Sequence, residues 1–312
     1  MALPTYASPL ERVWHWTYIA ICVAIFVFLI APIIVVIPLS FNAEPYFTFT
    51  EKMLSFDPDG YSMRWYDTLL TFGMSRADAP RDASWWADAW ANAKWLNAAK
   101  NSLIVGFFST ILATVLGTLA ALGLSRPEMP FRRIIMAVLI SPMIVPIIIT
   151  ATGMFFFYSS TCVDTTSTIG RLLAPMLSNS GCLANTYLGV ILAHATLGIP
   201  FVIITVTATL IGFDQSLNRA AASLGANPRT TFFKITMPLI LPGVISGALF
   251  AFVTSFDEVV AVLFIAGPDQ QTIPRQMWNG IREQISPAIL AVATLLVIFS
   301  IALLATVEVL RR

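Results

Sequence analysis

Two adjacent carboxylates, Asp257 and Glu258, follow a long uncharged run of the sequence. If this run forms a membrane helix that begins near residue 242, Asp257 lies about 22 Å along it at 1.5 Å per residue. A carboxylate exposed to lipid at that depth would cost on the order of 3 kcal/mol. Asp257 is therefore expected to face a cation, a water-filled cavity or both, or else to form a structural ion pair with Arg275 or Arg282. The pattern favours a structural role for Glu258, because neighbouring helix residues point about 100° apart.

The remaining reactive side chains do not have the spacing of a catalytic or metal site. No lysine completes a phosphate-binding GxxxxGK[ST] loop, and no GxSxG nucleophile motif occurs. The two histidines, His15 and His194, form no metal-ligand pattern with the cysteines. His194 interrupts an apolar run, where it either hydrogen-bonds to a neighbouring helix or relays a proton. The chain is predicted to be non-catalytic, with no metal and no cofactor of its own.

The elements that must position these side chains are long apolar helices. Of 312 residues, 57% are hydrophobic and 11% charged, whereas about a quarter of a soluble domain is charged. Six uncharged runs are each long enough for a bilayer core, which needs about 20 apolar helical residues. The ten-residue alternation typical of membrane barrels is missing. We therefore predict an all-α integral membrane protein with six transmembrane helices, near residues 17–39, 102–125, 134–157, 186–210, 242–265 and 287–310.

Lysine and arginine concentrate in two of the short loops, and short loops rich in these residues remain in the cytoplasm. The loops after the second and fourth expected helices carry Arg126, Arg132, Arg133, Arg219, Arg229 and Lys234. The loops after the third and fifth carry Arg171, Arg275 and Arg282. This difference predicts that both termini are cytoplasmic and that residues 44–100 and 159–185 lie on the outer, periplasmic side.

Residues 44–100 form a long segment between two expected helices. Its second half contains four tryptophans with polar residues between them: Trp85, Trp86, Trp90 and Trp95. Tryptophan is enriched where membrane meets water, so we expect an amphipathic helix at the outer membrane surface. Stacking on a ligand is the alternative role for these side chains.

The three cysteines agree with this topology. Cys22 falls within the first expected helix, where it is expected to pack as a small apolar residue. Cys162 and Cys182 both fall in the outer loop 159–185, where an oxidising compartment would permit a disulfide between them. The sequence leaves open whether this bond forms.

The cytoplasmic loop 214–238 has the composition of a docking element. Residues 219–225 are rich in alanine and end in Gly225, which favours a short helix with a glycine at its C-terminal end. Asn227 and Pro228 permit a turn, and Pro238 and Pro242 are expected to break the path just before the fifth membrane helix. A small helix held at the membrane surface suits docking into a groove of another protein, although an ordinary interfacial loop is the alternative.

This loop resembles the EAA loop of permease subunits from bacterial ATP-binding cassette (ABC) importers. The matching positions are Ala220, Ala221, Leu224 and Gly225, followed by Phe233, Ile235, Pro238 and Pro242. The resemblance implies the type I ABC importer permease fold, with Arg219, Ala220, Ala221, Leu224 and Gly225 coupling the membrane helices to an ATPase subunit. Arg219 departs from the pattern, because the family's usual residue there is a glutamate. A salt bridge from that position to a basic ATPase residue is therefore in doubt.

Further motifs resemble the spermidine/putrescine branch of this family. They are Arg64-Trp65-Tyr66, Asn101-Ser102-Leu103, Ser255-Phe-Asp-Glu-Val-Val260, Ala266-Gly-Pro268, Ile273-Pro274 and Ile285-Ser-Pro287. The segments around 72–94 and 159–183 are longer than this branch leads us to expect. The resemblance implies polyamine import, with Asp257, Glu258 and Trp278 along the substrate path. Trp278 could add cation–π contacts there or anchor the chain at the interface.

The resemblance also implies the assembly in which such a subunit acts. The expected partners are a second permease subunit in a heterodimer, two copies of an ATP-binding subunit that hold ATP and Mg²⁺, a periplasmic substrate-binding protein and membrane lipid, with no nucleic acid. The expected location is the inner membrane of a bacterium. An importer of 4-aminobutyrate, an opine or another small cation remains an alternative. A secondary transporter of another class would require inverted repeats or paired broken helices, and no convincing internal repeat is found. Pro142 and Pro146 could mark a discontinuous third helix, but proline kinks also occur in ordinary membrane helices.

Overall fold

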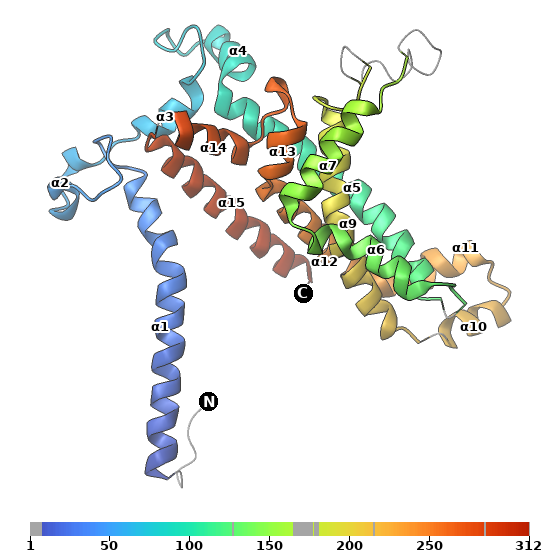
Figure 1. Ribbon diagram of the computed structural model, residues 1–312. Helices are drawn as coiled ribbons and strands as arrows, with labels where there is room; N and C mark the ends of the chain where they lie inside the picture. Colours follow the sequence, from blue (N-terminus) through green and yellow to red (C-terminus); the bar gives the residue numbers. More distant parts are fainter. Residues whose placement is uncertain are drawn as a thin grey trace. The chain divides into compact units, whose positions relative to one another are not determined.

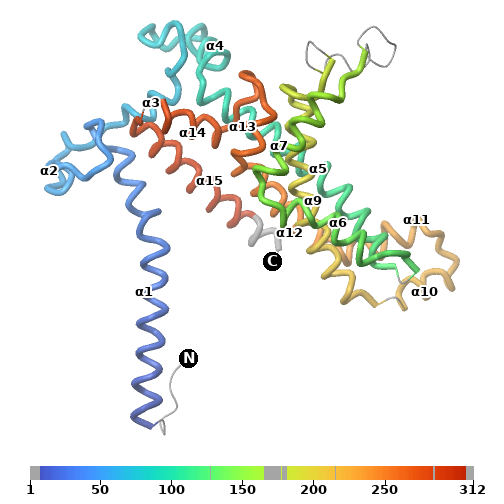
Figure 2. Tube along the Cα trace, in the orientation of Figure 1, coloured from blue at the N-terminus to red at the C-terminus, as the bar shows by residue number. Residues whose placement is uncertain are grey.

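The computed structural model describes residues 8–126, 128–164, 177, 181–214, 216–283 and 285–311, with side chains as far as residue 306. The chain divides into two compact units, Met1–Phe72 with Gly280–Arg312, and Gly73–Asn279. Helices make up most of both units (Figures 1 and 2). In the described part, five helices are long and apolar enough to cross a membrane, and one bent pair could supply a sixth span. The predicted all-α membrane architecture is confirmed.

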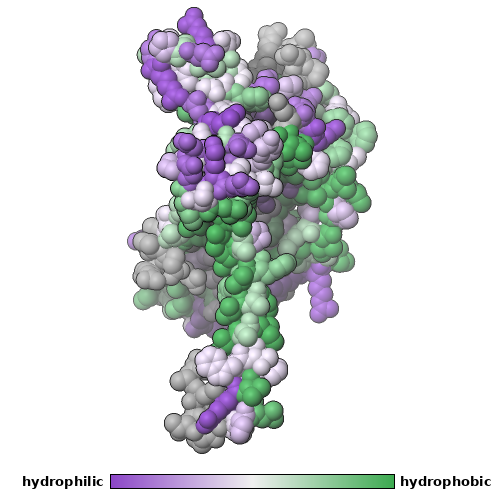
Figure 3. Space-filling model, turned by 90° about the vertical axis from the view of Figure 1, so that its left-hand side faces the viewer, coloured by the Kyte–Doolittle hydropathy of each residue, from purple (hydrophilic) through white to green (hydrophobic). Residues whose placement is uncertain are grey.

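The first unit contains two of these spans, α1 (Pro9–Leu39) and α15 (Ala288–Arg311). α1 starts earlier than the predicted residue 17, because Ser8 and Glu11 form a capping box in which each side chain accepts the other's backbone N–H. The apolar stretch of α1 is entirely unburied, and Figure 3 shows its side chains as an apolar column. Such a surface needs lipid or another protein around it.

Between α1 and α3 (Arg64–Thr71), the chain folds around the buried side chain of Asn42. The Asn42 Nδ2 atom donates to the carbonyl oxygens of Tyr46 (3.1 Å) and Thr48 (3.0 Å). The indole Nε1 of Trp65 donates to the Asn42 carbonyl oxygen at 2.7 Å. These bonds fix the polar segment that also contains the short helices α2 (Glu51–Leu54) and η1 (Pro58–Gly60).

Three helices form the core of the second unit: α5 (Lys94–Leu124), α9 (Tyr187–Ile211) and α12 (Met237–Asp257). Small residues let their backbones approach closely. A methyl group added at Gly117 of α5 would lie 2.7 Å from Cβ of Val202, and one added at Gly247 of α12 would lie 2.9 Å from its Cα. Small residues at helix contacts are typical of membrane proteins, where lipid provides no hydrophobic drive for association.

The third predicted helix, residues 134–157, is not continuous. It consists of α6 (Arg132–Ile144) and α7 (Ile147–Ser160), which meet at an angle of 103°. Pro146 disfavours a helical conformation at the residue before it, and Val145 is extended, with ψ of 136°. Pro142 lies inside α6 without ending it. The prediction of one helix was wrong because apolar composition continues across the break.

The fifth predicted helix, residues 242–265, starts and ends earlier than expected. Helical structure runs from α11 (Pro228–Thr231) through the π-helical segment η3 (Phe232–Thr236) into α12. The expected interruptions at Pro238 and Pro242 were therefore wrong. A wider π turn precedes Pro238 and accommodates its ring, and Pro242 lies inside α12 without ending it. α12 ends at Asp257, and the chain continues as α13 (Val260–Ile265), η4 (Pro268–Gln270) and α14 (Ile273–Glu283).

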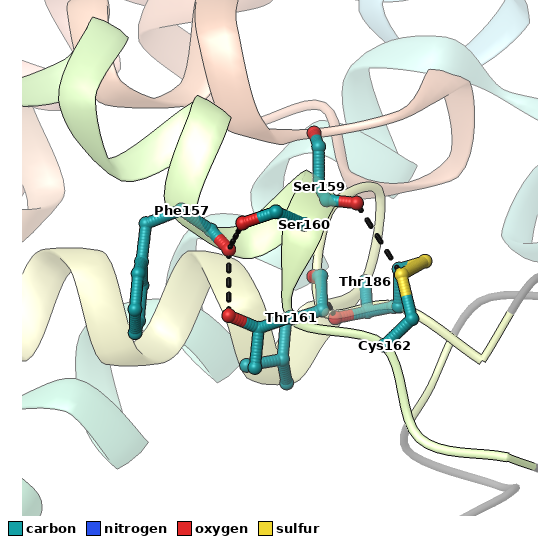
Figure 4. Close-up of a disulfide and its surroundings, with 8 residues drawn as sticks. Phe157, Ser159, Ser160, Thr161, Cys162 and Thr186 are labelled. Atoms are coloured by element: carbon teal, nitrogen blue, oxygen red, sulfur yellow. Dashed lines mark hydrogen bonds between the residues drawn. A yellow bond between two sulfur atoms is a disulfide. The ribbon is translucent and has the colours of Figure 1, made fainter.

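A disulfide joins Cys162, just after α7, to Cys182, just before α9. Figure 4 shows how α7 ends beside it, with the Thr161 hydroxyl donating back to the Phe157 carbonyl oxygen at 2.7 Å. The sulfur of Cys162 lies 3.3 Å from the preceding turn's carbonyl oxygen, which is a contact only, because a disulfide sulfur carries no proton. Much of the predicted outer loop 159–185 lies outside the described residues.

Candidate functional site

The two carboxylates singled out in the sequence lie where α12 gives way to α13. Asp257 is the last residue of α12 and is exposed in this chain. Glu258 is buried, and its Oε1 atom accepts a 2.9 Å hydrogen bond from the N–H of Ala261 in the first turn of α13. This bond satisfies a backbone donor that a helix start leaves free. The two neighbouring acids therefore have different environments: Glu258 is buried and caps α13, whereas the Asp257 side chain is exposed.

Asp257 belongs to an exposed stripe on α12. Ser246, Phe250, Val253 and Asp257 follow one another at intervals of three or four residues and therefore share one helix face. All four are exposed, whereas the other side of α12 packs against α5 and α9. A carboxylate directed at lipid would cost about 3 kcal/mol, so this face is suited to water, a substrate or another protein chain.

Arg275 on α14 does not pair with these carboxylates. Its Nη1 atom donates to the carbonyl oxygens of Val262 (3.0 Å), Ala266 (2.7 Å) and Gly267 (3.4 Å). These carbonyls lie at the C-terminal end of α13, where a cation is favourable. Trp278, three residues along α14, is partly exposed, and no hydrogen bond or ring contact joins it to either acid among the described residues.

A buried polar chain, which the sequence did not predict, connects the three core helices. Nδ1 of His194 on α9 lies 2.8 Å from Oγ of Ser255 on α12. That oxygen in turn lies 2.9 Å from Oγ of Ser109 on α5. His194 is only 1% exposed. This geometry fits the hydrogen-bonded structural histidine that the sequence analysis proposed, and the serines are separated from it by too many residues for the contacts to be foreseen.

A second network holds the segment between α13 and α14 against α5 and α9. Nδ2 of Asn101 donates to the carbonyl oxygens of Asp269 (2.8 Å) and Gln271 (2.9 Å). Its Oδ1 atom accepts from the Tyr187 hydroxyl at 2.7 Å. The next residue, Ser102, accepts a 2.8 Å bond from the Ile273 N–H. The Asn101-Ser102 motif therefore anchors a segment about 170 positions later in the chain.

The predicted loop helix is present as α10 (Ser216–Ser223). Two residues after its end lies Gly225, whose φ of +78° is unfavourable for other residues, and the N–H of Ala226 donates back to the Ala221 carbonyl oxygen. At its start, the Ser216 hydroxyl and N–H donate to the Asp214 carboxylate, which lowers the pKa of Asp214. Asn227 then caps the next helix by accepting from the Thr230 N–H at 2.8 Å.

The five predicted coupling residues do not all share a surface. Ala221 is buried, whereas Arg219, Ala220, Leu224 and Gly225 are exposed. Leu224 is 88% exposed and stands one helical turn from Ala220. Arg219 lies about 140° away from Leu224 around the helix axis. Ala220 and Leu224, with exposed Leu217 one turn earlier, form the apolar stripe of α10.

The apolar spans, joined by the buried polar contacts of the core helices, define a helical multi-pass membrane protein. The sequence matches the family described as "Binding-protein-dependent transport system inner membrane component" over residues 113–312. The chain belongs to this family and is a multi-pass membrane protein. Among the described residues, no cluster of histidine, cysteine or acidic side chains could hold a metal ion.

Individual relatives match most of the chain. It is 27% identical to the spermidine/putrescine transport system permease protein PotC of Haemophilus influenzae, over 92% of this chain and 93% of PotC. It is 30% identical to the putrescine transport system permease protein PotI of Escherichia coli K12, over 94% and 88% respectively. The fold is similar to the crystal structure of a bacterial ABC transporter involved in the import of the acidic polysaccharide alginate, with a TM-score of 0.62, 15% identity and 99% of both chains covered.

Proposed function

We propose that this chain is the permease subunit of an ABC importer for polyamines, and that Asp257 contacts the cationic cargo. The single observation that carries the cargo proposal is the exposed carboxylate of Asp257 at the end of the α12 stripe. The similarity to PotC and PotI, whose names state polyamine transport, supports it. Asp257 supplies a fixed negative charge, and Phe250, about two turns earlier on the same face of α12, supplies an apolar wall.

The stripe of α12 is suited to a path that releases its cargo. One carboxylate attracts an ammonium group through a medium of intermediate polarity, whereas a cluster of acids would hold a polyamine too tightly to let it leave. Trp278 on α14, which is 44% exposed, is the proposed cation–π surface for the ammonium groups of the cargo. A second permease subunit completes the enclosure in a heterodimer.

The apolar stripe of α10, Leu217, Ala220 and Leu224, is the proposed docking element for an ATPase subunit. Leu224 is 88% exposed, and keeping a leucine side chain in water is unfavourable. Burying it in a groove of a partner protein would therefore stabilise the complex. Two ATPase subunits with ATP and Mg²⁺ would close together and move α10, which is followed along the chain by α11, η3 and α12. A periplasmic binding protein would deliver the cargo on the opposite side.

The proposed orientation puts both termini and α10 in the cytoplasm. Arg126, Arg132, Arg133, Arg219, Arg229 and Lys234 then lie on the cytoplasmic side. The disulfide between Cys162 and Cys182 lies on the periplasmic side, which is oxidising.

ATP hydrolysis by the reconstituted complex tests the proposal. The chain is combined with its permease partner, ATPase and binding protein in liposomes, and putrescine, spermidine and 4-aminobutyrate are added in turn. Stimulation by a polyamine supports the cargo. Stimulation by 4-aminobutyrate alone retains the importer and rejects the polyamine. No association with an ATPase would reject the importer in favour of an ion-coupled transporter.

A further inference from the structure

The helix α4 (Ala83–Asn92) immediately precedes α5 and has one buried and one exposed face. Trp85 is 1% exposed, and its Nε1 atom donates to the Ala77 carbonyl oxygen at 3.3 Å. Trp86 and Trp90, one turn apart, are 51% and 62% exposed. The ring of Trp86 packs edge-on against Trp85, with centroids 4.9 Å apart. The buried indole thus fixes the helix, and the two neighbouring indoles each keep about half or more of their surface exposed.

Lys100 on α5 links Trp90 to the membrane-spanning helix. Its ammonium nitrogen donates to the Trp90 carbonyl oxygen and lies 4.6 Å from the centroid of the Trp90 ring. Lys100 also begins a stripe on α5 that continues through Ile104, Phe107 and Ile111 at intervals of three or four residues. These three apolar side chains are all exposed. Trp90 therefore stands at the head of an exposed apolar stripe of a candidate span.

The position along α5 is that of a membrane–water boundary. From Lys100 to Leu124, where α5 ends, the helix measures about 36 Å at 1.5 Å per residue. The hydrocarbon core of a bilayer is about 30 Å thick, and about 40–45 Å with its headgroups. When α5 spans the bilayer, Lys100 and Trp90 consequently lie in one headgroup layer, with Arg126 in the other.

We propose that Trp86, Trp90 and Lys100 form an anchor that inserts into the phospholipid headgroup layer. Indoles prefer this layer because they have an apolar body and a polar N–H. A cationic ligand is disfavoured, since the lysine ammonium already lies over the ring of Trp90 and would repel a second cation. Lipid phosphate is favoured by the same charge, because an anionic phosphate group attracts the lysine ammonium.

Tryptophan quenching by brominated lipid tests this anchor in the full transporter complex. The protein is reconstituted with phosphatidylcholine brominated near the headgroup, and the double variant Trp86→Phe, Trp90→Phe is compared with the unmodified chain. Trp95→Phe is the matched control, because Trp95 is buried at the start of α5. The proposal expects the double variant to lose lipid-dependent quenching that the control retains. Equal quenching in all three proteins would overturn it.

Two further measurements distinguish lipid from other occupants of this face. If aqueous iodide quenches the two indoles while brominated lipid does not, the face meets water and the proposal fails. If neither quenches them, or the binding protein shields them from iodide, a protein covers the face and the proposal also fails. Finally, Lys100→Gln is expected to lower quenching by brominated phosphatidylglycerol more than by phosphatidylcholine. An unchanged ratio would overturn the role of charge.

Discussion

Oγ of Ser255 lies 2.8 Å from Nδ1 of His194, so that a single hydrogen bond joins α12 to α9 only two residues before Asp257. The same hydroxyl is shared with Ser109 of α5. Polar contacts between membrane helices contribute about 0.6–2 kcal/mol each. The hydrogen bonds among His194, Ser255 and Ser109 thus hold α9, α12 and α5 in register close to the end of α12, where the proposed cargo contact lies.

His194→Ala is predicted to destabilise the protein by about 2–4 kcal/mol, because it leaves a cavity and removes the hydrogen bond to Ser255. His194→Asn, which retains a short polar side chain, is expected to cost less and to preserve transport. Thermal unfolding of the purified complex measures the first effect, and uptake into proteoliposomes measures the second. If His194→Asn abolished transport while unfolding was unchanged, the histidine would act as a proton relay.

The two adjacent acids are predicted to respond differently to neutralisation. Asp257→Asn removes one ammonium contact of about 1 kcal/mol and should raise the half-saturating polyamine concentration about fivefold. Because Asp257 is exposed, the free energy of unfolding should change little. ATP hydrolysis titrated with putrescine gives the half-saturating value.

Glu258→Ala serves as the control for that experiment. It removes the acceptor for the Ala261 N–H and should lower stability by about 1 kcal/mol, with the half-saturating concentration unchanged. The opposite assignment, in which only Glu258→Ala alters the polyamine response, would move the cargo contact from the exposed acid to the buried one.

Charge-free runs predicted the five apolar spans and the apolar region of the bent pair α6 and α7, because transfer of charge into lipid is costly wherever it occurs. The breaks depend on local details that this signal does not contain. Pro146 ends a helix while Pro142 does not, and the break after Asp257 has neither proline nor glycine beside it. There, the Glu258 cap makes a new helix start favourable.

The candidate functional residues also divide into those that local sequence predicts and those that depend on contacts between distant parts of the chain. Gly225 was readable from sequence because its position after an alanine-rich run is typical of a helix end. Burial of Ala221 and exposure of Leu224 follow from how α10 lies on the rest of its unit. The contact of Asn101 with Gln271 joins distant parts of the chain, and no short-range pattern encodes such a pair.

Arg275→Ala is predicted to destabilise the second unit by about 2–4 kcal/mol, since three carbonyl oxygens at the end of α13 would lose a charged donor. The stability of Arg275→Lys should fall between those of the unmodified protein and Arg275→Ala, because an ammonium keeps the charge but does not reproduce the planar guanidinium. Denaturant unfolding of the detergent-purified protein gives the order. A lysine variant less stable than the alanine variant would contradict it.

Reduction of the disulfide is predicted to lower the stability of the protein by about 3 kcal/mol, the value expected for closing a loop of this length. Cys162 and Cys182 are 20 positions apart. The paired serine variant should reproduce the effect of reductant, whereas Cys22→Ser should not, because Cys22 is a free thiol. Unfolding midpoints with and without dithiothreitol measure this difference. Identical midpoints would mean that this bond does not constrain the unfolded chain.

The apolar stripe of α10 gives the sharpest test of ATPase coupling. Leu224→Glu places a charge where the proposed groove is apolar, and burying it unpaired would weaken docking by about 2 kcal/mol or more, at least about a thirtyfold loss of affinity. The control is Ala222→Glu, because Ala222 is also exposed on α10 but lies about 160° from Leu224 around the axis. Co-purification of the ATPase and cargo-stimulated hydrolysis should both fall for Leu224→Glu and persist for Ala222→Glu. Equal losses would indicate that α10 as a whole, and not its apolar stripe, meets the ATPase.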